Sequence, residues 1–576
     1  MPDVPNLNQP PAACPPHRRR LRLRLPRMAQ RLRGPLWGGT PGRRLGLAGA
    51  AVAAAAALAA PQADAALTEN LTTSVTAMAL GNAVTADPPG IDSIHFNPAG
   101  LARLEGDSES FHMFGASIRN NNSFHQPDGF DIGGWTQDPL AGSHSGPVRQ
   151  GMYVPGYGKP GWRLPAVVVP GIGMAWNTAG SPWTFATNSY MAEAMSIDRS
   201  SDPNDPAQYD GRQLQLQRLV YLAPSVGYKY SDTLRFGVSV PIAHAAFVVD
   251  TAMRFPNELL GVFGKLQQGW CPDNGGNIID VFGFGVCGGG QDGMVTPFKK
   301  AADMRLEMSA PFDPTINLGV LWEPKPWFAF GAVYQGGSKT HYTGTYEFDT
   351  TPMLRNFVQG LNSSLLGPIA GATLGFPTSI PAQQKGNLSA TIPFPTHLQL
   401  GIKLRPIQYV QLNVDLSYST WSEWDALNFQ FDQSIKLLEV AHLYGYADSS
   451  KLSIPRGYQS KVNPAFGLQL FPTDWLTLRL GYEPRKSSIP GDKIDLLAPL
   501  PDTKLYSAGL NIKLGKNSDL SLTGSYMVGK YSVPANTDCN LNCNIFLNVI
   551  YNPYAGLDVA GDFRVRYVGL DFTHRF

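Results

Sequence analysis

Apolar and polar residues alternate with a period of two in many segments of the chain. The clearest segment is residues 568–576, where the residues on one face are Val568, Leu570, Phe572, His574 and Phe576. The same alternation runs through 398–404, 410–418, 476–482 and 520–528. Successive side chains of a strand point to opposite faces, so these segments predict strands with one apolar and one polar face. A soluble antiparallel sheet and a membrane barrel both give this pattern, and alternation alone does not separate them.

The connections between the predicted strands alternate in length. Tight turns are predicted at 231–233, 323–326, 405–408, 472–474 and 515–519. Long connections are predicted near 119–162, 180–212, 250–302, 342–394, 422–461, 483–504 and 531–562. This rhythm is typical of outer-membrane barrels and rare in compact soluble domains. We therefore predict a transmembrane antiparallel β-barrel of about 14 strands, an even number as such barrels require.

Residues 1–65 have the composition of a secretory signal. An arginine-rich region is followed by an alanine- and leucine-rich segment at 45–60, with Ala63 and Ala65 marking the expected cleavage site. Met28 is an alternative start that would shorten the basic region. The apolar segment is shorter and richer in alanine than the ~20 strongly apolar residues that a membrane-spanning helix needs. We expect residues 1–65 to be removed on export.

Composition narrows the remaining possibilities. Charged residues make up only 16% of the chain, and the formal net charge of +2 gives no reason to expect nucleic-acid binding. Cys271 and Cys287 are close in sequence, as are Cys539 and Cys543, so in an exported chain we expect two disulfides rather than a metal site. No complete catalytic motif stands out, so we expect neither an enzyme nor a cofactor.

Residues 66–104 precede the first predicted strand and are too apolar for a free tail. Inside a barrel, a segment of this length would occlude the lumen, and the alternative is a simple periplasmic arm. The expected organisation is therefore a signal at 1–65, this segment at 66–104 and a barrel at 105–576.

Two of the long connections carry apolar residues at helical spacing. These residues are Leu259, Leu260, Phe263, Leu354, Phe357, Val358, Leu361 and Leu365. An apolar stripe on an external loop either docks a hydrophobic ligand or packs against other loops. Lys403, Arg405 and Arg479 are candidates to face the lumen and attract an acidic headgroup, although ordinary ion pairs are the commoner use of such residues.

The segments Leu80-Gly81-Asn82-Ala83 and Phe96-Asn97-Pro98-Ala99-Gly100-Leu101 resemble the FadL family of outer-membrane transport proteins. That family includes transporters of long-chain fatty acids and of aromatic hydrocarbons. The resemblance implies a 14-stranded barrel whose N-terminal segment is a hatch that plugs the lumen, with Asn97, Pro98, Ala99 and Gly100 as gating residues. It also implies that helices at 256–268 and 353–370 form a capture site.

The resemblance further implies lateral release of the ligand through a kinked third strand. We expect this strand at 171–176, with the opening formed by Asn177, Thr178, Ala179 and Gly180. The chain departs from the family after Pro501-Asp502, where Thr503-Lys504-Leu505 replaces a segment that often carries an arginine in fatty-acid transporters. The prediction of a ligand with a carboxylate headgroup is therefore less secure than the prediction of a generic hydrophobic ligand.

The expected function is passive transport of hydrophobic small molecules across the bacterial outer membrane, by loop capture, hatch gating and lateral release. The expected partners are the ligand, a fatty acid or hydrocarbon, and the surrounding outer-membrane lipid and lipopolysaccharide, with the chain acting as a monomer. The alternative is a general diffusion porin for small polar solutes.

Overall fold

The computed structural model describes residues 69–152, 162–164, 167–178, 180–271, 285–365, 367–444, 448–544 and 552–576. The chain divides into two units, Met1–Pro61 and Gln62–Phe576, and the fold below is that of the second. The predicted signal at 1–65 lies outside the described residues. Within the described ranges, no helix has both the length and the apolar character needed to cross a membrane.

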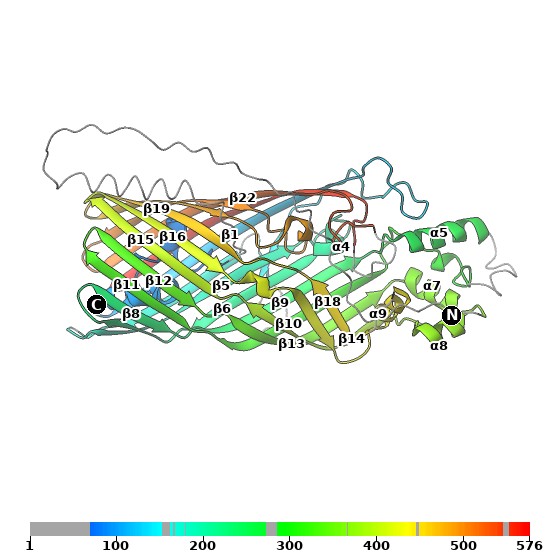
Figure 1. The fold of residues 1–576 in the computed structure, drawn as a ribbon, viewed down its shortest axis with the longest axis horizontal. Coiled ribbons are helices and arrows are strands. Elements are labelled where there is room, and N and C mark those ends of the chain that lie inside the picture. Colours follow the sequence, from blue (N-terminus) through cyan, green and yellow to red (C-terminus); the bar gives the residue numbers. More distant parts are fainter. Residues whose placement is uncertain are drawn as a thin grey trace, which may run out of the picture. The chain divides into compact units, whose positions relative to one another are not determined.

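Fourteen antiparallel strands form a closed barrel, which confirms the predicted fold class (Figure 1). Several strands are interrupted and carry two labels. In order around the barrel they are β1 (Ser108–His125), β4 (Val167–Trp176), β5 (Trp183–Asp198), β6 and β7 (Gln213–Leu222, Ser225–Lys229), β8 and β9 (Leu234–Ser239, Ile242–Met253), β10 and β11 (Ala302–Pro314, Asn317–Lys325), β12 and β13 (Phe328–Gln335, Ser338–Thr350), β14 and β15 (Gln383–Phe394, His397–Ile407), β16 and β17 (Val410–Ser419, Ala426–Phe431), β18 and β19 (Lys451–Pro455, Lys461–Thr473), β20 (Leu476–Arg485), β21 (Thr503–Leu514), β22 (Ser518–Val533) and β23 (Asp558–Arg575).

The barrel closes where the first strand pairs with the last. The ladder between β1 and β23 runs from Ser108 opposite Arg575 to His125 opposite Asp558, so it uses the full length of both strands. The terminal strand therefore has neighbours on both edges, β1 and β22. A closed ladder leaves no free edge that could pair with another chain.

The outward face of the wall is apolar, as the alternation predicts. Val568, Leu570 and Phe572 of β23 are exposed, whereas Val565 and Tyr567 are buried inside. Other strands show the same outward apolar positions, including Ile172, Phe185, Phe236, Leu318, Leu398, Leu400, Leu412, Leu478, Leu480 and Leu522. The polar exception, His574, shares a hydrogen bond of 2.9 Å with the hydroxyl of Ser518 on β22.

The third strand of the barrel is β5, which lies inside the predicted long connection at 180–212. That expectation was wrong because β5 does not show simple alternation: residues 190–198 are almost all buried on both faces. The segment 171–176, predicted as the third strand, is instead part of the second strand, β4. Asn177, Thr178 and Gly180 lie in the short turn between β4 and β5, and Ala179 lies outside the described residues.

The longer helices of the connections, at residues 258–270, 352–362 and 367–374, lie at the end of the barrel opposite the C-terminus (Figure 1). The helical segments in the connections are α4 (Gln208–Gly211), α5 (Glu258–Trp270), η2 (Gln291–Gly293), α7 (Pro352–Asn362), α8 (Gly367–Leu374), η3 (Trp421–Glu423), α9 (Lys436–Glu439), η4 (Val440–Tyr444) and η5 (Gly491–Lys493). The helix predicted at 353–370 is therefore two helices. The chain breaks there because the Ser363 and Ser364 hydroxyls donate to the carbonyls of Gly360 and Leu361, which competes with helical bonding.

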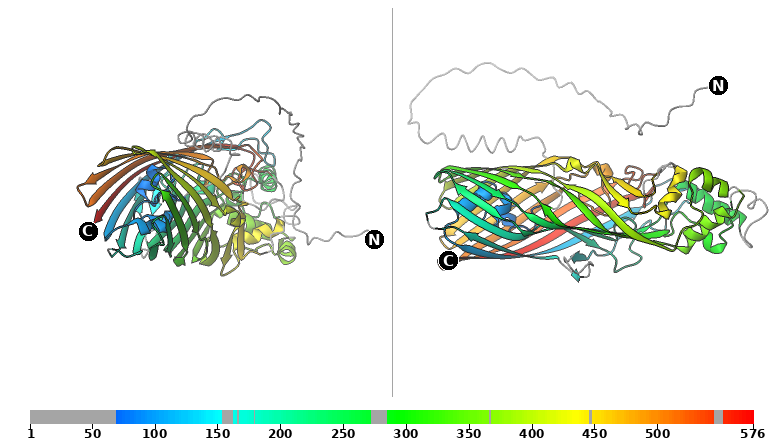
Figure 2. Two further views of the ribbon diagram at one scale, coloured as in Figure 1. Left: turned by 60° about the vertical axis from the view of Figure 1, so that its left-hand side comes forward. Right: turned by 90° about the horizontal axis from the view of Figure 1, so that it is seen from below.

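Residues 69–104, called the hatch below, lie inside the barrel near the end with the short turns (Figure 2). The hatch contains α2 (Val75–Ala79), α3 (Ser93–Phe96) and η1 (Pro98–Arg103). Helix α2 packs against β20, β21 and β22, and η1 packs against β7, β8 and β11. Most hatch residues are buried, which agrees with their apolar sequence.

Glycines in the wall allow the hatch backbone to approach closely. A Cβ atom on Gly237 would lie 2.0 Å from the carbonyl carbon of Pro98, and one on Gly481 would lie 2.1 Å from the nitrogen of Gly81. The other wall glycines that face the hatch in this way are Gly173, Gly227, Gly319, Gly331, Gly401, Gly467 and Gly509. We call these nine residues the glycine belt; any larger residue at these positions would push the hatch away from the wall.

Candidate functional site

An apolar cavity of about 390 Å³ lies toward the end of the barrel that carries the loop helices. Most of its apolar lining comes from five interrupted strands and from α9: Phe247, Val249, Met253, Met304, Leu306, Phe348, Leu427, Phe429, Leu437, Leu438, Leu452 and Ile454. Within each strand these residues are spaced by two, so one face of the strand forms the lining. The volume lies in the range of small-molecule sites.

The cavity is not predicted by the sequence pattern. The alternation at 247–253 and at 427–429 is visible in the sequence, but it does not reveal which face points inward. In the half of the barrel near the short turns the apolar face is outside, whereas at the cavity the apolar residues point inside. A change of environment along one strand is invisible to a pattern with a period of two.

A buried ion pair forms part of the cavity wall. The guanidinium of Arg456 binds the carboxylate of Asp495, and their side chains are 4% and 5% exposed. The second oxygen of Asp495 accepts a hydrogen bond of 2.8 Å from the nitrogen of Ala498. Burial disfavours the charge of Arg456, but the neighbouring Asp495 more than compensates and raises the pKa of the guanidinium above its ordinary value.

A second carboxyl group, that of Asp210, lines the same cavity. One of its oxygens accepts a hydrogen bond of 2.6 Å from the nitrogen of Leu496, next to Asp495. Burial raises the pKa of Asp210 well above its usual range, and the charge of Asp495 adds to the increase. The polar part of the cavity thus combines one arginine with two carboxyl groups and the amide of Asn540.

A smaller cavity of about 30 Å³ shares Phe247, Leu427, Arg456 and Leu497 with the first. It is also lined by an aromatic cluster of Trp421, Trp424 and Tyr458, in which Trp424 and Tyr458 are stacked with their ring centres 5.6 Å apart.

The aromatic cluster connects the smaller cavity to the hatch. The indole nitrogen of Trp421 donates to the carboxylate of Glu69, at the beginning of the described hatch. Arg485 in turn donates to the backbone carbonyl of Glu69 and binds Glu483 at 2.8 Å. The start of the hatch therefore contacts the cluster that borders the smaller cavity.

The predicted gating residues hold the hatch to itself and to the wall. The side-chain amide of Asn97 donates to the carbonyls of Thr85 at 2.8 Å and Val320 at 3.1 Å, and its oxygen accepts from the nitrogen of Ala99. Pro98 begins η1 and lies against Gly237 of β8. A Cβ atom on Gly100 would lie 2.4 Å from the Pro88 side chain, so this position also requires glycine.

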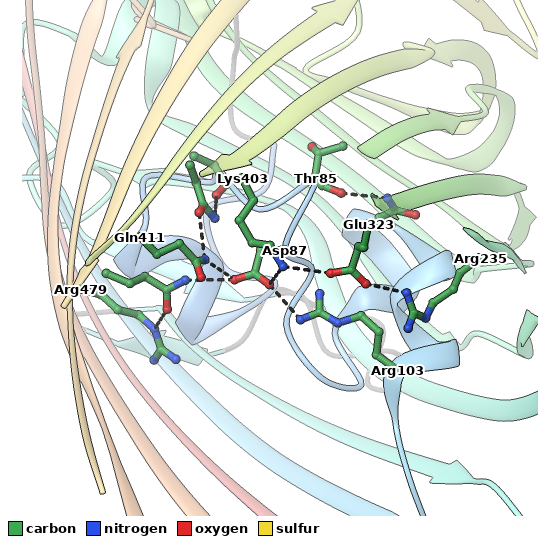
Figure 3. A network of polar contacts seen from close by, with 12 residues as sticks. Thr85, Asp87, Arg103, Arg235, Glu323, Lys403, Gln411 and Arg479 are labelled. Atoms are coloured by element: carbon green, nitrogen blue, oxygen red, sulfur yellow. Dashed lines mark hydrogen bonds and ion pairs between the residues drawn. The ribbon is translucent and has the colours of Figure 1, made fainter. Parts of the chain in front are cut away.

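Charged groups of the hatch and the wall form one network (Figure 3). Asp87 of the hatch binds Arg103 at 2.9 Å and lies 3.7 Å from the ammonium of Lys403 on β15. Lys403 also binds Glu323 at 2.9 Å, and Glu323 binds Arg235 at 2.6 Å. Burial alone would raise the pKa of Asp87, but Arg103 and Lys403 hold it well below its ordinary value.

None of the three predicted headgroup residues is among the described residues that line the apolar cavity. The ammonium group of Lys403 forms an ion pair with Glu323, and the guanidinium of Arg479 donates a hydrogen bond of 3.2 Å to the side-chain oxygen of Gln469. Arg405 donates to the carbonyl of Gln408 in the short turn and lies over the ring of Phe471. Among the described residues, the cation that lines the cavity is Arg456, and its partner Asp495 is distant in sequence and could not be inferred from spacing.

The predicted loop residues pack mainly against one another and the barrel. Leu354, Phe357 and Val358 of α7 are buried, and the ring of Phe357 lies 5.8 Å from the ring of Phe263 on α5. Leu259, Leu260 and Leu361 are half-buried, whereas Leu365 is 59% exposed. The structure joins Cys271 to Cys287 and Cys539 to Cys543, with Cα atoms 5.6 and 4.6 Å apart.

A break in strand pairing lies beside β5. In the described part of the wall, β4 pairs with β5 only from Ile172 opposite Ser189 to Trp176 opposite Phe185. Beyond Ser189, β5 continues with β6 on its other edge and has a bulge between Met191 and Glu193. The carbonyl of Met191 accepts hydrogen bonds from the hydroxyls of Thr72 and Thr73, both 3.3 Å long, so the hatch contacts the bulge.

The predicted opening at 177–180 is at the other end of this strand pair. Asn177 is fixed there by hydrogen bonds from its backbone to Asp107 and from its side chain to Thr184. The pairing break therefore lies between β5 and the part of β4 before Ile172, which contains Pro170 and Gly171. Neither glycine nor proline lies at the bulge of β5 itself.

Comparisons with known proteins agree with this architecture. The family described as "Outer membrane protein transport protein (OMPP1/FadL/TodX)" matches residues 51–576. No curated protein matches the chain. Among solved structures, a Pseudomonas aeruginosa FadL homologue is similar over 89% of this chain and 100% of its own, with 15% identity and a TM-score of 0.62.

Two toluene transporters are also similar in fold. The Pseudomonas putida transporter TodX is 13% identical over 90% of this chain and 100% of its own, with a TM-score of 0.55. The Ralstonia pickettii transporter TbuX is 13% identical over 87% of this chain and 97% of its own, with a TM-score of 0.51. Since the family match covers nearly the whole barrel and hatch, the chain belongs to the FadL/TodX family of outer-membrane transport proteins, and the outer membrane is its location.

Proposed function

We propose that the chain transports hydrophobic small molecules passively across the outer membrane, with cargo of the fatty-acid or hydrocarbon class. The observation that carries the proposal is the apolar cavity of about 390 Å³ within a barrel whose lumen is filled by the hatch. The titles of the similar structures, a FadL homologue and toluene transporters, support this class of cargo. A general porin needs an open polar lumen, and the hatch argues against that alternative.

Transport begins at the loop helices. Val262 and Trp270 of α5, Ile369 of α8 and the neighbouring Leu365 are each more than 40% exposed. Apolar side chains on an external surface favour contact with a hydrophobic solute. The solute then moves into the cavity, where burial stabilises it by about 25 cal/mol for each Å² of apolar surface removed from water. A single chain closes the barrel, so a monomer surrounded by outer-membrane lipid and lipopolysaccharide suffices for this route.

The hatch controls the next step. A ligand that leaves the larger cavity toward the smaller one reaches Trp421, whose partner Glu69 belongs to the hatch. Displacement of the hatch around Asn97, Pro98, Ala99 and Gly100 would then allow the ligand to leave the smaller cavity.

The exit is lateral, through the pairing break beside β5. In this proposal Thr72 and Thr73 separate from the bulge at Met191 when the hatch moves, and the ligand enters the membrane between β4 and β5. The break supports this exit because, among the described residues, β4 and β5 do not continue the ladder of hydrogen bonds beyond Ile172 and Ser189.

Filling the cavity tests the function. Leu306, a fully buried lining residue of β10, is changed to tryptophan, and uptake of a radiolabelled C16 alcohol and a C16 fatty acid by intact cells is measured. We expect Leu306→Trp to lower uptake of at least one of the two at least about fivefold, because overpacking removes the ligand's space. Leu400→Trp, on the outward face, is the matched control.

The porin alternative is tested separately by swelling of liposomes that contain the purified protein. We expect slow swelling in sugar solutions. Unchanged uptake in Leu306→Trp together with rapid sugar swelling would replace the proposed transporter by a porin.

A further inference from the structure

We propose that Asp495 sets the substrate class: by occupying Arg456 it makes the cavity a site for uncharged hydrophobic molecules and excludes carboxylates. This inference rests on the transport function proposed above and narrows its cargo. It assigns a specificity-determining role to a pair that the sequence pattern does not single out.

The ion pair lies on the path between the two cavities. Arg456 lines both the larger and the smaller cavity, so a ligand that passes between them moves along it. Its guanidinium is the cation among the described residues of the larger cavity, and that cation already binds Asp495. A carboxylate ligand would therefore have to compete with a carboxylate that is held in place by Ala498.

A second carboxyl group lies near the pair. Asp210 also lines the cavity, and its carboxyl group accepts a hydrogen bond from the nitrogen of Leu496. With one arginine and two carboxyl groups, the polar lining carries no net positive charge in either protonation state of Asp210. Bringing a further carboxylate into a buried site without a free cation is strongly unfavourable.

The other polar groups of the cavity are uncharged. The side chains of Asn540 and Ser453 line it, and they can hydrogen-bond to a neutral oxygen such as that of an alcohol. The site thus suits an apolar molecule with at most a small uncharged polar group.

A matched pair of ligands tests the inference. Binding of 1-dodecanol and dodecanoate to the full chain, purified in an amphipathic polymer, is measured at pH 8 by equilibrium dialysis with radiolabelled ligands. We expect the wild-type protein to bind the alcohol at least about tenfold more tightly, because a misplaced like charge costs at least as much as a tenfold change in affinity.

The variant Asp495→Asn frees Arg456 and keeps the size of the side chain. We expect it to bind dodecanoate at least about tenfold more tightly than the wild type, with alcohol binding changed less than about threefold. The double variant Asp495→Asn/Arg456→Gln should lose this gain. Asp495→Ser is a second single variant for the case that Asp495→Asn does not fold; it also removes the carboxylate that binds Arg456, so it should shift the preference toward dodecanoate in the same direction.

The outcomes separate this inference from the proposed function. Equal or tighter binding of dodecanoate by the wild type, or no gain in either single variant, overturns the role of Asp495 and leaves transport through the cavity intact. Failure of Leu306→Trp to weaken binding of either ligand overturns the cavity itself, and with it both proposals.

Discussion

At the scale of residues, the important charges find partners that are far away in the sequence. Alternation correctly places Lys403 on the inner face of its strand, but its partner Glu323 is 80 positions away and belongs to another strand. Arg456 pairs with Asp495 across 39 positions, and Asp210 approaches the same site from a third connection. Spacing rules detect neighbours within one element, so a single sequence identifies candidates for such sites but not the pairs they form.

His95 of the hatch gives a prediction of pH dependence. Its ring contacts the Tyr190 hydroxyl at 3.2 Å and the Asn70 side chain at 2.5 Å. Burial lowers the pKa of His95 from 6.5 to about 3, and the charges of His397 and Arg218 contribute. The docked hatch therefore binds fewer protons than the released hatch between about pH 3 and 6.5, so docking weakens as the pH falls through that window. Between pH 7 and pH 5 the free energy of hatch docking becomes less favourable by roughly 1–2 kcal/mol.

Sugar permeability of liposomes measured from pH 7 to 5 checks this effect. We expect His95→Gln, which keeps hydrogen-bonding groups but does not titrate, to show a smaller increase in permeability on acidification than the wild type. Burial raises the pKa of Asp92 to about 7, so the titration of Asp92 changes hatch docking in the opposite direction. The comparison therefore uses the difference between the wild type and His95→Gln. Identical pH profiles would exclude His95 as a determinant of docking.

At the scale of elements, the barrel is predictable and its exceptions are not. The strands with one exposed apolar face, such as β16 and β23, follow from alternation alone. Strand β5 does not, because the hatch and neighbouring connections cover both of its faces and remove the alternation on which the prediction depends. The pairing break lies beside this strand. The strand that contributes most to the proposed exit is therefore the one with the weakest sequence signal.

The glycine belt predicts how the hatch is seated. In Gly237→Ala the new methyl group would meet the backbone of Pro98, so the hatch has to shift, at a cost of about 1–3 kcal/mol. We expect faster swelling of liposomes in sugar solutions, with the barrel still folded as judged by its heat-modifiable mobility on gels. Gly524→Ala is the control, because a Cβ atom on Gly524 of β22 meets nothing within 4 Å. Equal swelling rates in the two variants would show that the hatch does not depend on this contact.

At the scale of the whole molecule, one short segment contacts the aromatic cluster beside the smaller cavity, the charged network and the bulge at the proposed exit. The hatch touches the aromatic cluster through Glu69, the charged network through Asp87 and the bulge of β5 through Thr72 and Thr73. A barrel of this size leaves a wide lumen unless something fills it, so in the proposed route the hatch controls which solutes cross. The fold class follows from the sequence pattern, and the family resemblance implies a segment inside the barrel. The three contacts, in contrast, require the register of every strand between them.

Locking the hatch to the bulge tests the proposed exit. In the double variant Thr72→Cys/Met191→Cys, a short bismaleimide links the two positions, whose wild-type residues are joined by a hydrogen bond. We expect the linked protein to retain binding of the alcohol in the cavity. Its rate of uptake should fall at least about tenfold, because a change at a gate acts on passage and not on the binding site. The single variant Thr72→Cys, treated with the same reagent, controls for modification of the hatch. A non-reducible linker leaves Cys271–Cys287 and Cys539–Cys543 intact during the assay. Undiminished uptake after complete linkage would mean that the ligand leaves without separating the hatch from β5, and the exit would then have to lie elsewhere in the barrel.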